Sequence, residues 1–296
     1  MDNLNYTVSN NCQLSIINYQ LSIINCQLSI INYQLSIINF QLKKNMILVF
    51  GGTTEGKKVA KWLEKRALHY FYSTKTEIEF DQGQFGHYRF GAFTATDLIS
   101  FCQKNHIKTI IHASHPFAEL LHQCIEEVST FLAIPVFRFE RAYPERIVSK
   151  EVNYVKNYEE AINYLHTHTF SNLLALTGVQ TIEKLKPYWE KHTTYFRILP
   201  RETSVTIAEK VGFPSQNLIL EFPNTNIDDE IATIKKYNCE AVITKESGES
   251  GYLSVKINAA KYCNIPIIII ERKPLPRSFI LVSNENELFN SLLVNQ

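Results

Sequence analysis

A short apolar run that begins at Met46 is followed by glycines and threonines whose spacing suits phosphate binding. The stretch reads MILVFGGTTEG, which predicts a strand, a tight turn and the start of a helix. Backbone N–H groups at a helix N-terminus bind anions, and threonine hydroxyls add further donors. The turn differs from the dinucleotide fingerprint G-x-G-x-x-G, because Thr53 stands in place of its middle glycine. We predict cofactor contacts from Gly51, Gly52, Thr53 and Thr54.

The end of the next predicted strand distinguishes NADPH from NADH. In a Rossmann unit, an acidic residue at this position binds the ribose 2′-hydroxyl of NAD, whereas polar and basic residues accept the 2′-phosphate of NADP. Here the strand runs into Ser73, Thr74 and Lys75, and Glu77 comes only later. Ser73 and Lys75 therefore favour NADPH, although an ordinary polar loop has the same composition.

A histidine follows the third predicted strand, in the sequence IIHASHPFAE. Ser114 is suited to cap the following helix, and Pro116 is suited to its first turn. These residues would hold His115 at the helix N-terminus, facing the same crevice as the glycine turn. Histidines in capping regions are often structural, so a functional role and a structural role both stay open.

Two turns in the second half of the chain repeat this pattern. LLALTGVQ places Thr177 and Gly178 after an apolar strand, and AVITKESGESGY places Lys245, Ser247 and Gly248 after another. Both turns can present N–H groups and hydroxyls to a cleft from the side opposite the glycine turn. Each is weak evidence by itself, because Gly and Ser occur in loops of every kind.

These candidates require elements that bring strand ends together, and the chain alternates β-rich runs with helical stretches. Runs such as TIIHA, AVIT and IPIIII are continuously apolar, which is typical of strands buried on both faces of a parallel sheet. The alternation favours an open, doubly wound α/β architecture. The predicted strands cover residues 47–50, 69–73, 109–113, 135–139, 153–155, 173–176, 194–198, 218–221, 241–244 and 266–270.

A domain boundary is predicted near RAYPERIVSK, residues 141–150. This segment follows a completed strand, contains a proline and is rich in basic residues, and the strand–helix alternation starts again after it. We therefore expect two Rossmann-like lobes with parallel sheets, residues 46–145 and 146–296, and a cofactor cleft between them. Ligands of such folds bind outside the carboxyl ends of the strands.

Residues 1–45 differ from the rest, because they contain four copies of one seven-residue unit: QLSIINY, QLSIINC, QLSIINY and QLSIINF. Leucine and isoleucine alternate three and four apart, as a coiled-coil seam requires. The near identity of the copies and the lack of flanking charges instead favour a translated tandem repeat upstream of a true start at Met46. Asn and Gln interrupt every apolar run, so we expect neither a signal peptide nor a membrane span.

The composition argues against several classes of protein. The chain has 30 basic and 29 acidic residues, and 28 of each remain from Met46 onward. This balance gives no support to nucleic-acid or membrane-surface binding. The cysteines after Met46 are far apart and lack metal-ligand spacing, which predicts free thiols in a reducing cytoplasm and no metal site. We expect a monomer, because no long exposed apolar segment is predicted beyond the repeat.

Taken in order, the motifs resemble those of the precorrin-6A reductase family, which includes the cobalt-precorrin-6A reductases of the anaerobic cobalamin pathway. They are GGT-x-EG after the first strand, ASHPFA after a later one, LTG in the second half, and ITKESG followed by IPIIIIERKP near the end. The resemblance runs from Met46 to about Pro274. HPFA combined with the TKxSG loop is more specific than the glycine turn.

The resemblance implies NADPH-dependent reduction of one double bond in a corrin precursor, with the dinucleotide between two α/β lobes. Two departures weaken the expected cofactor contacts. Arg89 and Gly91 stand where members often carry Gly-Arg, and SGESGY replaces a double glycine after the serine. In addition to the glycine turn, the family pattern places at the cleft His115, Pro116, Thr177, Gly178, Lys245, Ser247 and Gly248.

In such a reaction the nicotinamide supplies the hydride, so the protein mainly binds, orients and desolvates two planar partners. No proton donor from the protein is needed if the hydride adds to a conjugated iminium-like system. His115 is the titratable group that we predict as a catalytic acid or a carboxylate anchor. The anionic tetrapyrrole substrate predicts basic residues around the cleft, and the candidates are Arg138, Arg141 and Arg146.

Other classes of protein stay open at this stage. A short-chain dehydrogenase or epimerase needs a Tyr-x-x-x-Lys pair, which Tyr252 and Lys256 match by spacing, but about two hundred residues after the glycine turn. A non-catalytic NADPH-binding module would use the same cleft for regulation. A methyltransferase would bind S-adenosylmethionine at a similar turn, so binding of NADPH and of S-adenosylmethionine distinguishes the two.

Overall fold

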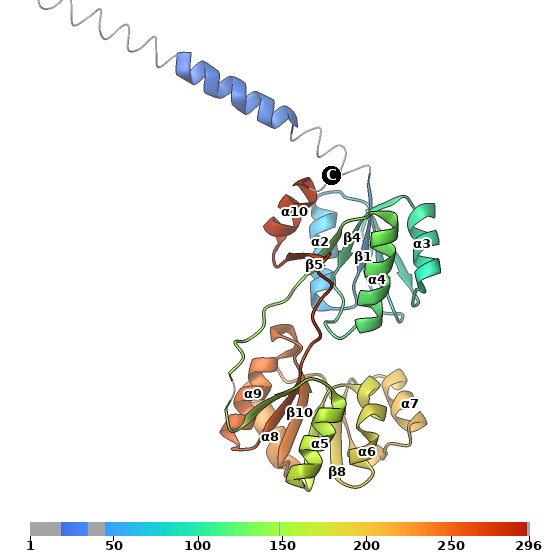
Figure 1. The fold of residues 1–296 in the computed structure, drawn as a ribbon, viewed down its shortest axis with the longest axis vertical. Helices are drawn as coiled ribbons and strands as arrows, with labels where there is room; N and C mark the ends of the chain where they lie inside the picture. Colours follow the sequence, from blue (N-terminus) through green and yellow to red (C-terminus); the bar gives the residue numbers. More distant parts are fainter. Residues whose placement is uncertain (1–18, 35–44, 148, 295–296) are drawn as a thin grey trace, which may run out of the picture.

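The structure is a computed structural model that describes residues 19–34, 45–147 and 149–294. Its main body consists of two α/β lobes, each built on one six-stranded sheet (Figure 1). Every pair of neighbouring strands in both sheets is parallel. The predicted fold class, two doubly wound lobes with parallel sheets, is confirmed.

The sheet of the first lobe has the strand order β12-β5-β4-β1-β2-β3. Its central strands are the apolar runs recognised in the sequence, and Leu48, Val49, Ile110 and Ile111 are fully buried. The strands are β1 (Met46–Phe50), β2 (Tyr70–Thr74), β3 (Gly86–Phe90), β4 (Ile107–His112), β5 (Val136–Phe139) and β12 (Ile280–Val282). The helices are α2 (Thr54–Lys65), α3 (Ala95–Lys104), α4 (Glu119–Leu132) and α10 (Glu285–Val294).

The sheet of the second lobe has the order β6-β11-β10-β7-β8-β9. Its strands are β6 (Val152–Val155), β7 (Asn172–Leu176), β8 (Thr193–Ile198), β9 (Leu218–Leu220), β10 (Ala241–Lys245) and β11 (Ile267–Ile270). The α-helices are α5 (Tyr158–His168), α6 (Lys186–Trp189), α7 (Glu202–Lys210), α8 (Ile227–Lys236) and α9 (Leu253–Tyr262). Short 3₁₀ turns are η1 (Val179–Thr181), η2 (Glu183–Leu185), η3 (Ser215–Asn217) and η4 (Glu249–Gly251).

The C-terminal segment returns to the first lobe, which corrects the predicted extent of the second lobe. We expected residues 146–296 to form the second lobe, but β12 pairs in parallel with β5 of the first sheet. Helix α10 then packs Leu288 and Leu292 into the first lobe's core. Arg66, the residue after α2, forms an ion pair with Glu285, and its guanidinium carbon lies 3.7 Å from the centre of the Phe289 ring. The chain therefore crosses between the lobes twice, after β5 and after β11 (Figure 1).

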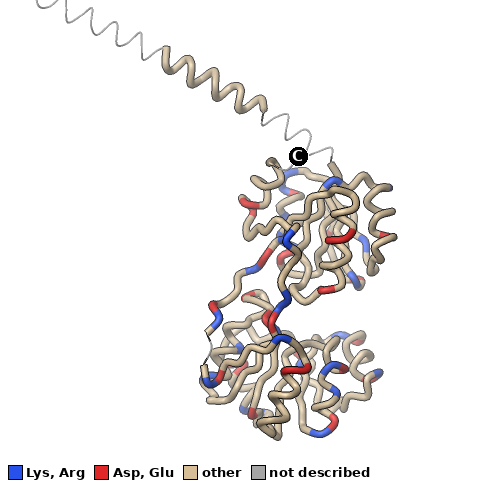
Figure 2. Tube along the Cα trace, in the orientation of Figure 1, with Lys and Arg blue, Asp and Glu red and all other residues tan. Residues whose placement is uncertain are grey.

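Ion pairs join these two crossings to each other and to the second sheet. Arg272 of the second crossing contacts Glu140 of the first at 2.8 Å. Glu246, which follows β10, accepts two hydrogen bonds from Arg146 at 2.7 Å each and one from Arg272 N at 3.1 Å. Figure 2 shows residues of both charge signs along the two crossings. The lobes are thus connected by two segments that ion pairs and hydrogen bonds hold together, rather than by a single unattached linker.

The described part of the N-terminal repeat, residues 19–34, forms a helix that is exposed along its whole length. The other repeat residues lie outside the described residues, so their predicted origin stays a prediction. Across the described ranges, no helix combines the length and apolarity needed to cross a membrane.

Candidate active site

The turn between β1 and α2 forms at the predicted place, but part of it is used within the protein. Thr53 caps α2, because its Oγ1 accepts a hydrogen bond from Gly56 N at 3.1 Å and donates one to Ala113 O at 2.6 Å. Its hydroxyl is therefore committed to the fold, which corrects the prediction that it donates to a phosphate. Thr54, the first residue of α2, is exposed and keeps its hydroxyl and N–H at the helix N-terminus.

Tyr72 of β2 lies directly beneath this turn and explains the glycines. Its hydroxyl accepts a hydrogen bond from Gly52 N at 2.9 Å. A Cβ at Gly51 would lie 2.1 Å from the Tyr72 ring, and a Cβ at Gly56 would lie 2.7 Å from Gly51 Cα. Gly52 has a φ of +86°, which glycine adopts without strain. The glycines thus permit close packing of strand, turn and helix, and they leave the outer side of the turn uncovered by side chains.

Glu55, also in this turn, contacts the second lobe. Its Oε2 lies 2.7 Å from Arg141 Nη2, and both side chains are buried, at 4% and 7% exposure. Arg141 Nη1 donates to Ser247 O at 2.9 Å, and Ser250 Oγ donates to Glu55 Oε1. Residues that follow β1, β5 and β10 therefore meet at one point, with the carboxyl ends of both sheets facing each other. We call this contact of Glu55, Arg141, Ser247 and Ser250 the junction.

The predicted contacts Ser247 and Gly248 belong to the same junction. Glu249 N donates to Ala142 O at 2.9 Å. Gly248 has a φ of +72°, and a Cβ there would lie 2.7 Å from Ala142 O. Glycine is required at this position, because the backbone of the first crossing passes too close for any side chain. Both residues are buried against Arg141 and Ala142, so their first role is to join the lobes.

His115 faces this junction from the first lobe. Its Nδ1 accepts a hydrogen bond from Phe117 N at 3.2 Å, so the neutral ring carries its proton on Nε2. Burial, followed by the charges of Lys245 and Arg141, lowers the pKa of His115 to about 3. At pH 7 the ring is therefore neutral. It has no imidazolium proton to release and no charge for a carboxylate, which argues against both predicted roles, while Nε2–H remains a hydrogen-bond donor.

Lys245 at the end of β10 lies opposite His115. Its Nζ is 5.4 Å from the centre of the Phe117 ring, which reaches across from the first lobe. No ion pair of Lys245 is found among the described residues. Burial, followed by the charge of Lys184, lowers its pKa to about 8. Lys245 is thus mostly protonated at pH 7 but able to release its proton.

Ser73, at the end of β2, holds the side chain of Arg89 on the neighbouring strand. Arg89 Nη1 donates to Ser73 Oγ at 2.6 Å, and Nη2 donates to Gly91 O at 2.9 Å. The guanidinium carbon lies 3.8 Å above the centre of the Phe93 ring. Lys75 is exposed two residues after Ser73. A fixed guanidinium and a hydroxyl thus lie where a Rossmann fold binds the 2′-position of its adenosine, and Lys75 follows in the same loop.

Arg138 does not reach the junction, contrary to prediction. Its side chain is only 1% exposed and pairs with Glu140 at 2.7 Å. Its Nη1 also donates to Ser114 O at 3.0 Å, so it supports the turn that carries His115. The sequence predicted β5 as the last strand of this lobe, but β12 covers it on the outer side. We therefore withdraw Arg138 from the predicted substrate contacts.

Arg146 lies on the first crossing and is 45% exposed. It pairs with Glu246 at 2.7 Å and with Glu271 at 3.3 Å. Pro116, by contrast, is buried at the start of the turn beside His115. Arg146 therefore holds a crossing in place, and a contact with substrate stays a prediction for this residue.

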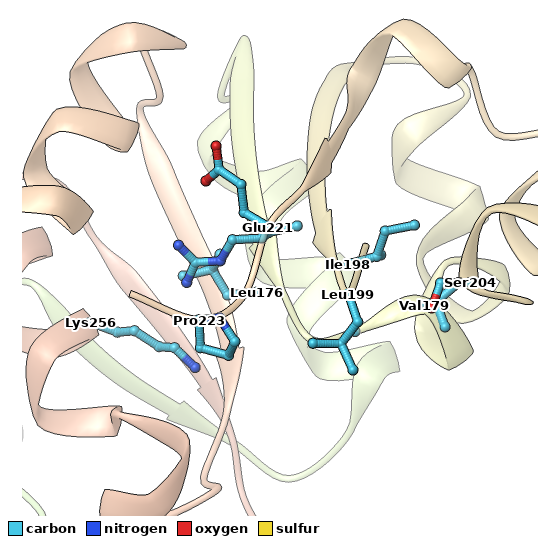
Figure 3. Close-up of a pocket in the computed structure, with 10 residues that line it drawn as sticks. Leu176, Val179, Ile198, Leu199, Ser204, Glu221, Pro223 and Lys256 are labelled. Carbon is cyan, nitrogen blue, oxygen red and sulfur yellow. The ribbon is translucent and has the colours of Figure 1, made fainter. Parts of the chain in front are cut away.

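Thr177 and Gly178 follow β7 at the carboxyl edge of the second sheet. Thr177 Oγ1 accepts a hydrogen bond from Thr181 Oγ1 at 2.7 Å, so it is used within the protein. Gly178 has a φ of +83° and lines a cavity of about 180 Å³, and no heavy atom lies within 4 Å of a Cβ built there. Figure 3 shows this cavity, with Lys256 of α9 on one side and Leu199 and Ser204 on the other.

A dinucleotide fits part of the predicted set. The uncovered outer side of the turn, the free helix N-terminus at Thr54, and Ser73 with Arg89 suit its phosphate and adenosine end. Lys245 and the Nε2–H of His115 offer donors where its nicotinamide end would meet a second ligand. Thr53 and Thr177 are occupied by protein contacts, and Ser247 and Gly248 pack against the first crossing.

The sequence did not reveal several charged residues at these places. Glu55 entered the sequence analysis only within the motif GGT-x-EG and Lys256 only through the Tyr-x-x-x-Lys alternative, and no role was predicted for Arg197 or Glu230. One signal was present for Arg197, which interrupts the otherwise uncharged β8 run TTYFRI. Its partner Glu230 lies on the next helix but one and could not be paired with it by sequence spacing.

The comparisons with known proteins agree with this fold. Residues 46–292 match the family described as "Precorrin-6x reductase CbiJ/CobK". The chain is similar to a cobalt-precorrin-6A reductase of Priestia megaterium, with 29% identity over 85% of this chain and 99% of that protein. It is also similar to a cobalt-precorrin-6A reductase of Methanococcus maripaludis, with 28% identity over 76% of this chain and 90% of that protein.

A solved structure described as "CobK precorrin-6A reductase" has a similar fold, with a TM-score of 0.70 and 19% identity, over 85% of this chain and 97% of that one. The matched family region begins at Met46 and includes both lobes, both crossings and the returning strand β12. The short-chain dehydrogenase alternative loses its basis, because the lysine of its motif, Lys256, lies within this matched region. The chain belongs to the precorrin-6x reductase CbiJ/CobK family.

Proposed function

We propose that the protein uses NADPH to reduce one carbon–carbon double bond of precorrin-6A or cobalt-precorrin-6A, giving the corresponding precorrin-6B. The observation that carries this proposal is that the carboxyl edges of the two sheets are in contact. Glu55, beside the glycine turn after β1, pairs with Arg141, and Arg141 donates a hydrogen bond to Ser247 O in the loop after β10. Family membership over both lobes supports the reaction class, an oxidoreductase that acts on a macrocycle double bond.

Reduction of a double bond adds one hydride and one proton. The nicotinamide, when bound, supplies the hydride. The chain's own residues bind and orient the two ligands and exclude water between the lobes. If the protein supplies the proton, its donor must hold a proton near pH 7 and be able to release it, and the pKa of about 8 favours Lys245 over the neutral His115. We assign the proton donor to Lys245 Nζ, and a hydrogen bond that orients a ligand to His115 Nε2.

The preference for NADPH rests on Arg89 together with Ser73 and Lys75. Exchange of Arg89 for Gln should raise the KM for NADPH about tenfold and change the KM for NADH little, because a charged hydrogen bond to a phosphate is worth about 1.5–3 kcal/mol. Steady-state kinetics with both coenzymes checks this. Lys108→Met, which removes an exposed charge from the amino end of β4, is the control. An equal change for both coenzymes would contradict the assignment.

The substrate's carboxylates require cations, and the arginines of the first crossing support this only in part. Arg141 and Arg146 both pair with carboxylates of the protein. Lys245 is unpaired within the described ranges and lies at the junction.

We further propose that the protein is a monomer in the cytoplasm. The free thiols of Cys102, Cys124, Cys239 and Cys263 support a reducing compartment.

The reaction is tested directly by following NADPH oxidation with and without enzymatically prepared precorrin-6A or its cobalt form. We expect oxidation that depends on the macrocycle and is faster with NADPH than with NADH at equal concentrations. The metal state that reacts faster identifies the physiological substrate. NADPH binding without turnover of either macrocycle would contradict the proposed substrate and leave the cofactor assignment standing.

A further inference from the structure

The cavity at the carboxyl edge of the second sheet contains a buried cation that the proposed reaction does not use. Lys256 of α9 lines this cavity and is only 5% exposed. No carboxylate of the described residues lies within ion-pair distance of its Nζ. Its hydrogen-bond partner is the uncharged Thr244 Oγ1, at 3.5 Å. A buried ammonium group without an anion is costly, so its retention calls for a partner from outside the chain.

Arg197 also lines this cavity and has a buried donor that the protein leaves unused. Arg197 of β8 pairs with Glu230 at 2.9 Å through Nη2, but its Nη1 is buried without a hydrogen-bond partner. Glu230 Oε1 is also unpartnered, so this pair leaves one donor and one acceptor unused. Together, Lys256 and Arg197 place two positive groups against one buried carboxylate, Glu230, while Glu221 lies at the exposed side of the lining. The buried donors without an anionic partner of their own suit an anionic oxygen group.

The size of the cavity decides which part of a ligand it admits. A volume of about 180 Å³ is below the range of roughly 300–1,000 Å³ that is usual for whole small-molecule ligands. A carboxylate on a short alkyl arm fits, with its chain against Leu176 and Leu199. The exposed residues Glu221 and Pro223 mark the open side, and Figure 3 shows the Glu221 carboxylate turned away from Lys256.

We infer that this cavity is an anion subsite that binds a side-chain carboxylate of the macrocycle, with Lys256 as its main ligand and Arg197 as a second donor. The inference rests on the proposed function, which supplies a substrate with many carboxylates. A phosphate of the dinucleotide has the same chemistry, but the turn suited to phosphate lies on the first lobe. The carboxyl ends of β7 and β8, which frame the cavity, belong to the same edge of the sheet as Lys245.

Lys256→Met tests the subsite in the full chain by equilibrium binding, without turnover. The probes are uroporphyrin, a stable tetrapyrrole carboxylate, together with NADPH and NADH. We expect uroporphyrin to bind about tenfold more weakly and both coenzymes to bind as in the wild type. Lys261→Met, which removes a partly buried lysine that lies on α9 outside the cavity lining, should change neither affinity. Lys256→Gln and the thermal unfolding temperatures of all variants confirm that the fold is kept.

The outcomes distinguish a macrocycle carboxylate from a dinucleotide phosphate as the anion that binds in the cavity. Weaker binding of NADPH, with uroporphyrin unchanged, would support the anion subsite but assign it to a dinucleotide phosphate. Unchanged affinity for all three probes in Lys256→Met would overturn the subsite, even if the wild type reduces the macrocycle. Conversely, uroporphyrin binding that depends on Lys256, in a chain that oxidises no NADPH with either macrocycle, would support the subsite and overturn the reaction.

Discussion

Exchange of Lys245 for Met should lower kcat about 100-fold or more and leave the affinity for NADPH within about threefold of the wild type. A positioned general acid contributes roughly 10²–10⁴ to the rate, and methionine fills the same volume without a proton to donate. Lys245 has the geometry for this role, because it lies at the end of β10, beside Phe117 of the opposite lobe. Single-turnover measurements with saturating NADPH and macrocycle check the loss.

The dependence of kcat on pH tests whether Lys245 acts in its protonated form. The acid acts when it is protonated, and burial lowers the pKa of Lys245 to about 8. The wild-type kcat should therefore be level below this pH and fall about tenfold per pH unit above it. Lys184→Met removes a neighbouring positive charge that lowers this pKa, so the fall should begin at a higher pH while kcat at pH 7 stays close to wild type.

Lys245→Arg separates a proton donor from a binding charge. Arginine keeps the positive charge but does not release a proton in proteins. If Lys245 is the acid, the arginine variant should be as slow as the methionine variant, and its profile should lose the fall near pH 8. Recovery of most of the wild-type kcat with arginine would contradict the assignment and indicate that Lys245 only holds an anionic group.

Exchange of Arg141 for Met should lower the free energy of unfolding by about 3–5 kcal/mol, because it leaves Glu55 as an unpaired buried charge. The Glu55 and Arg141 side chains are 4% and 7% exposed, and the two charged atoms are 2.7 Å apart. The pair joins helix α2 of the first lobe to the loop after β10 through Ser247 O and Ser250. Its loss should therefore loosen the junction as well as destabilise the fold.

The double variant Glu55→Gln/Arg141→Met shows how much of the lost free energy of unfolding comes from the unpaired Glu55 carboxylate. It should lose clearly less stability than the sum of the single variants, because no buried charge remains without a partner. Urea unfolding measures all of these free energies. Lys186→Met, from an exposed pair at 3.9 Å, is the control and should lose about 0.5 kcal/mol or less.

The two tryptophans allow each lobe to be followed separately in this experiment. Trp62 packs in the first lobe against Phe139, and Trp189 packs in the second lobe against Phe213. Because the chain has only these two, Trp62→Phe and Trp189→Phe leave one reporter in one lobe each. A loss below about 1 kcal/mol in Arg141→Met, with both reporters unchanged, would show that the pair does not support the junction.

The sequence by itself determined most of the elements, though not the edge strands β3 and β12, and the side of the sheet on which the site lies. Continuous apolar runs such as IPIIII can be buried only between two layers of helix, which predicts parallel strands. The glycines and polar residues that follow several of these runs predict loops at the carboxyl edge. Local chemistry also predicted a helix start after β1, where the Thr53 hydroxyl is the cap, but it misplaced the cap of the helix after His115, because the N-cap of α4 is Ala118 and not Ser114.

Only the tertiary structure decided which of these residues meet and which are buried. The short run Ile280–Val282 carries little local signal, yet it covers β5 and so buries Arg138, which an edge strand would have left exposed. Glu55 and Arg141 lie 86 positions apart, and Glu55 and Ser250 lie 195 apart. The pKa values of His115 and Lys245 depend on burial between lobes and on charges from distant segments, which no local pattern encodes.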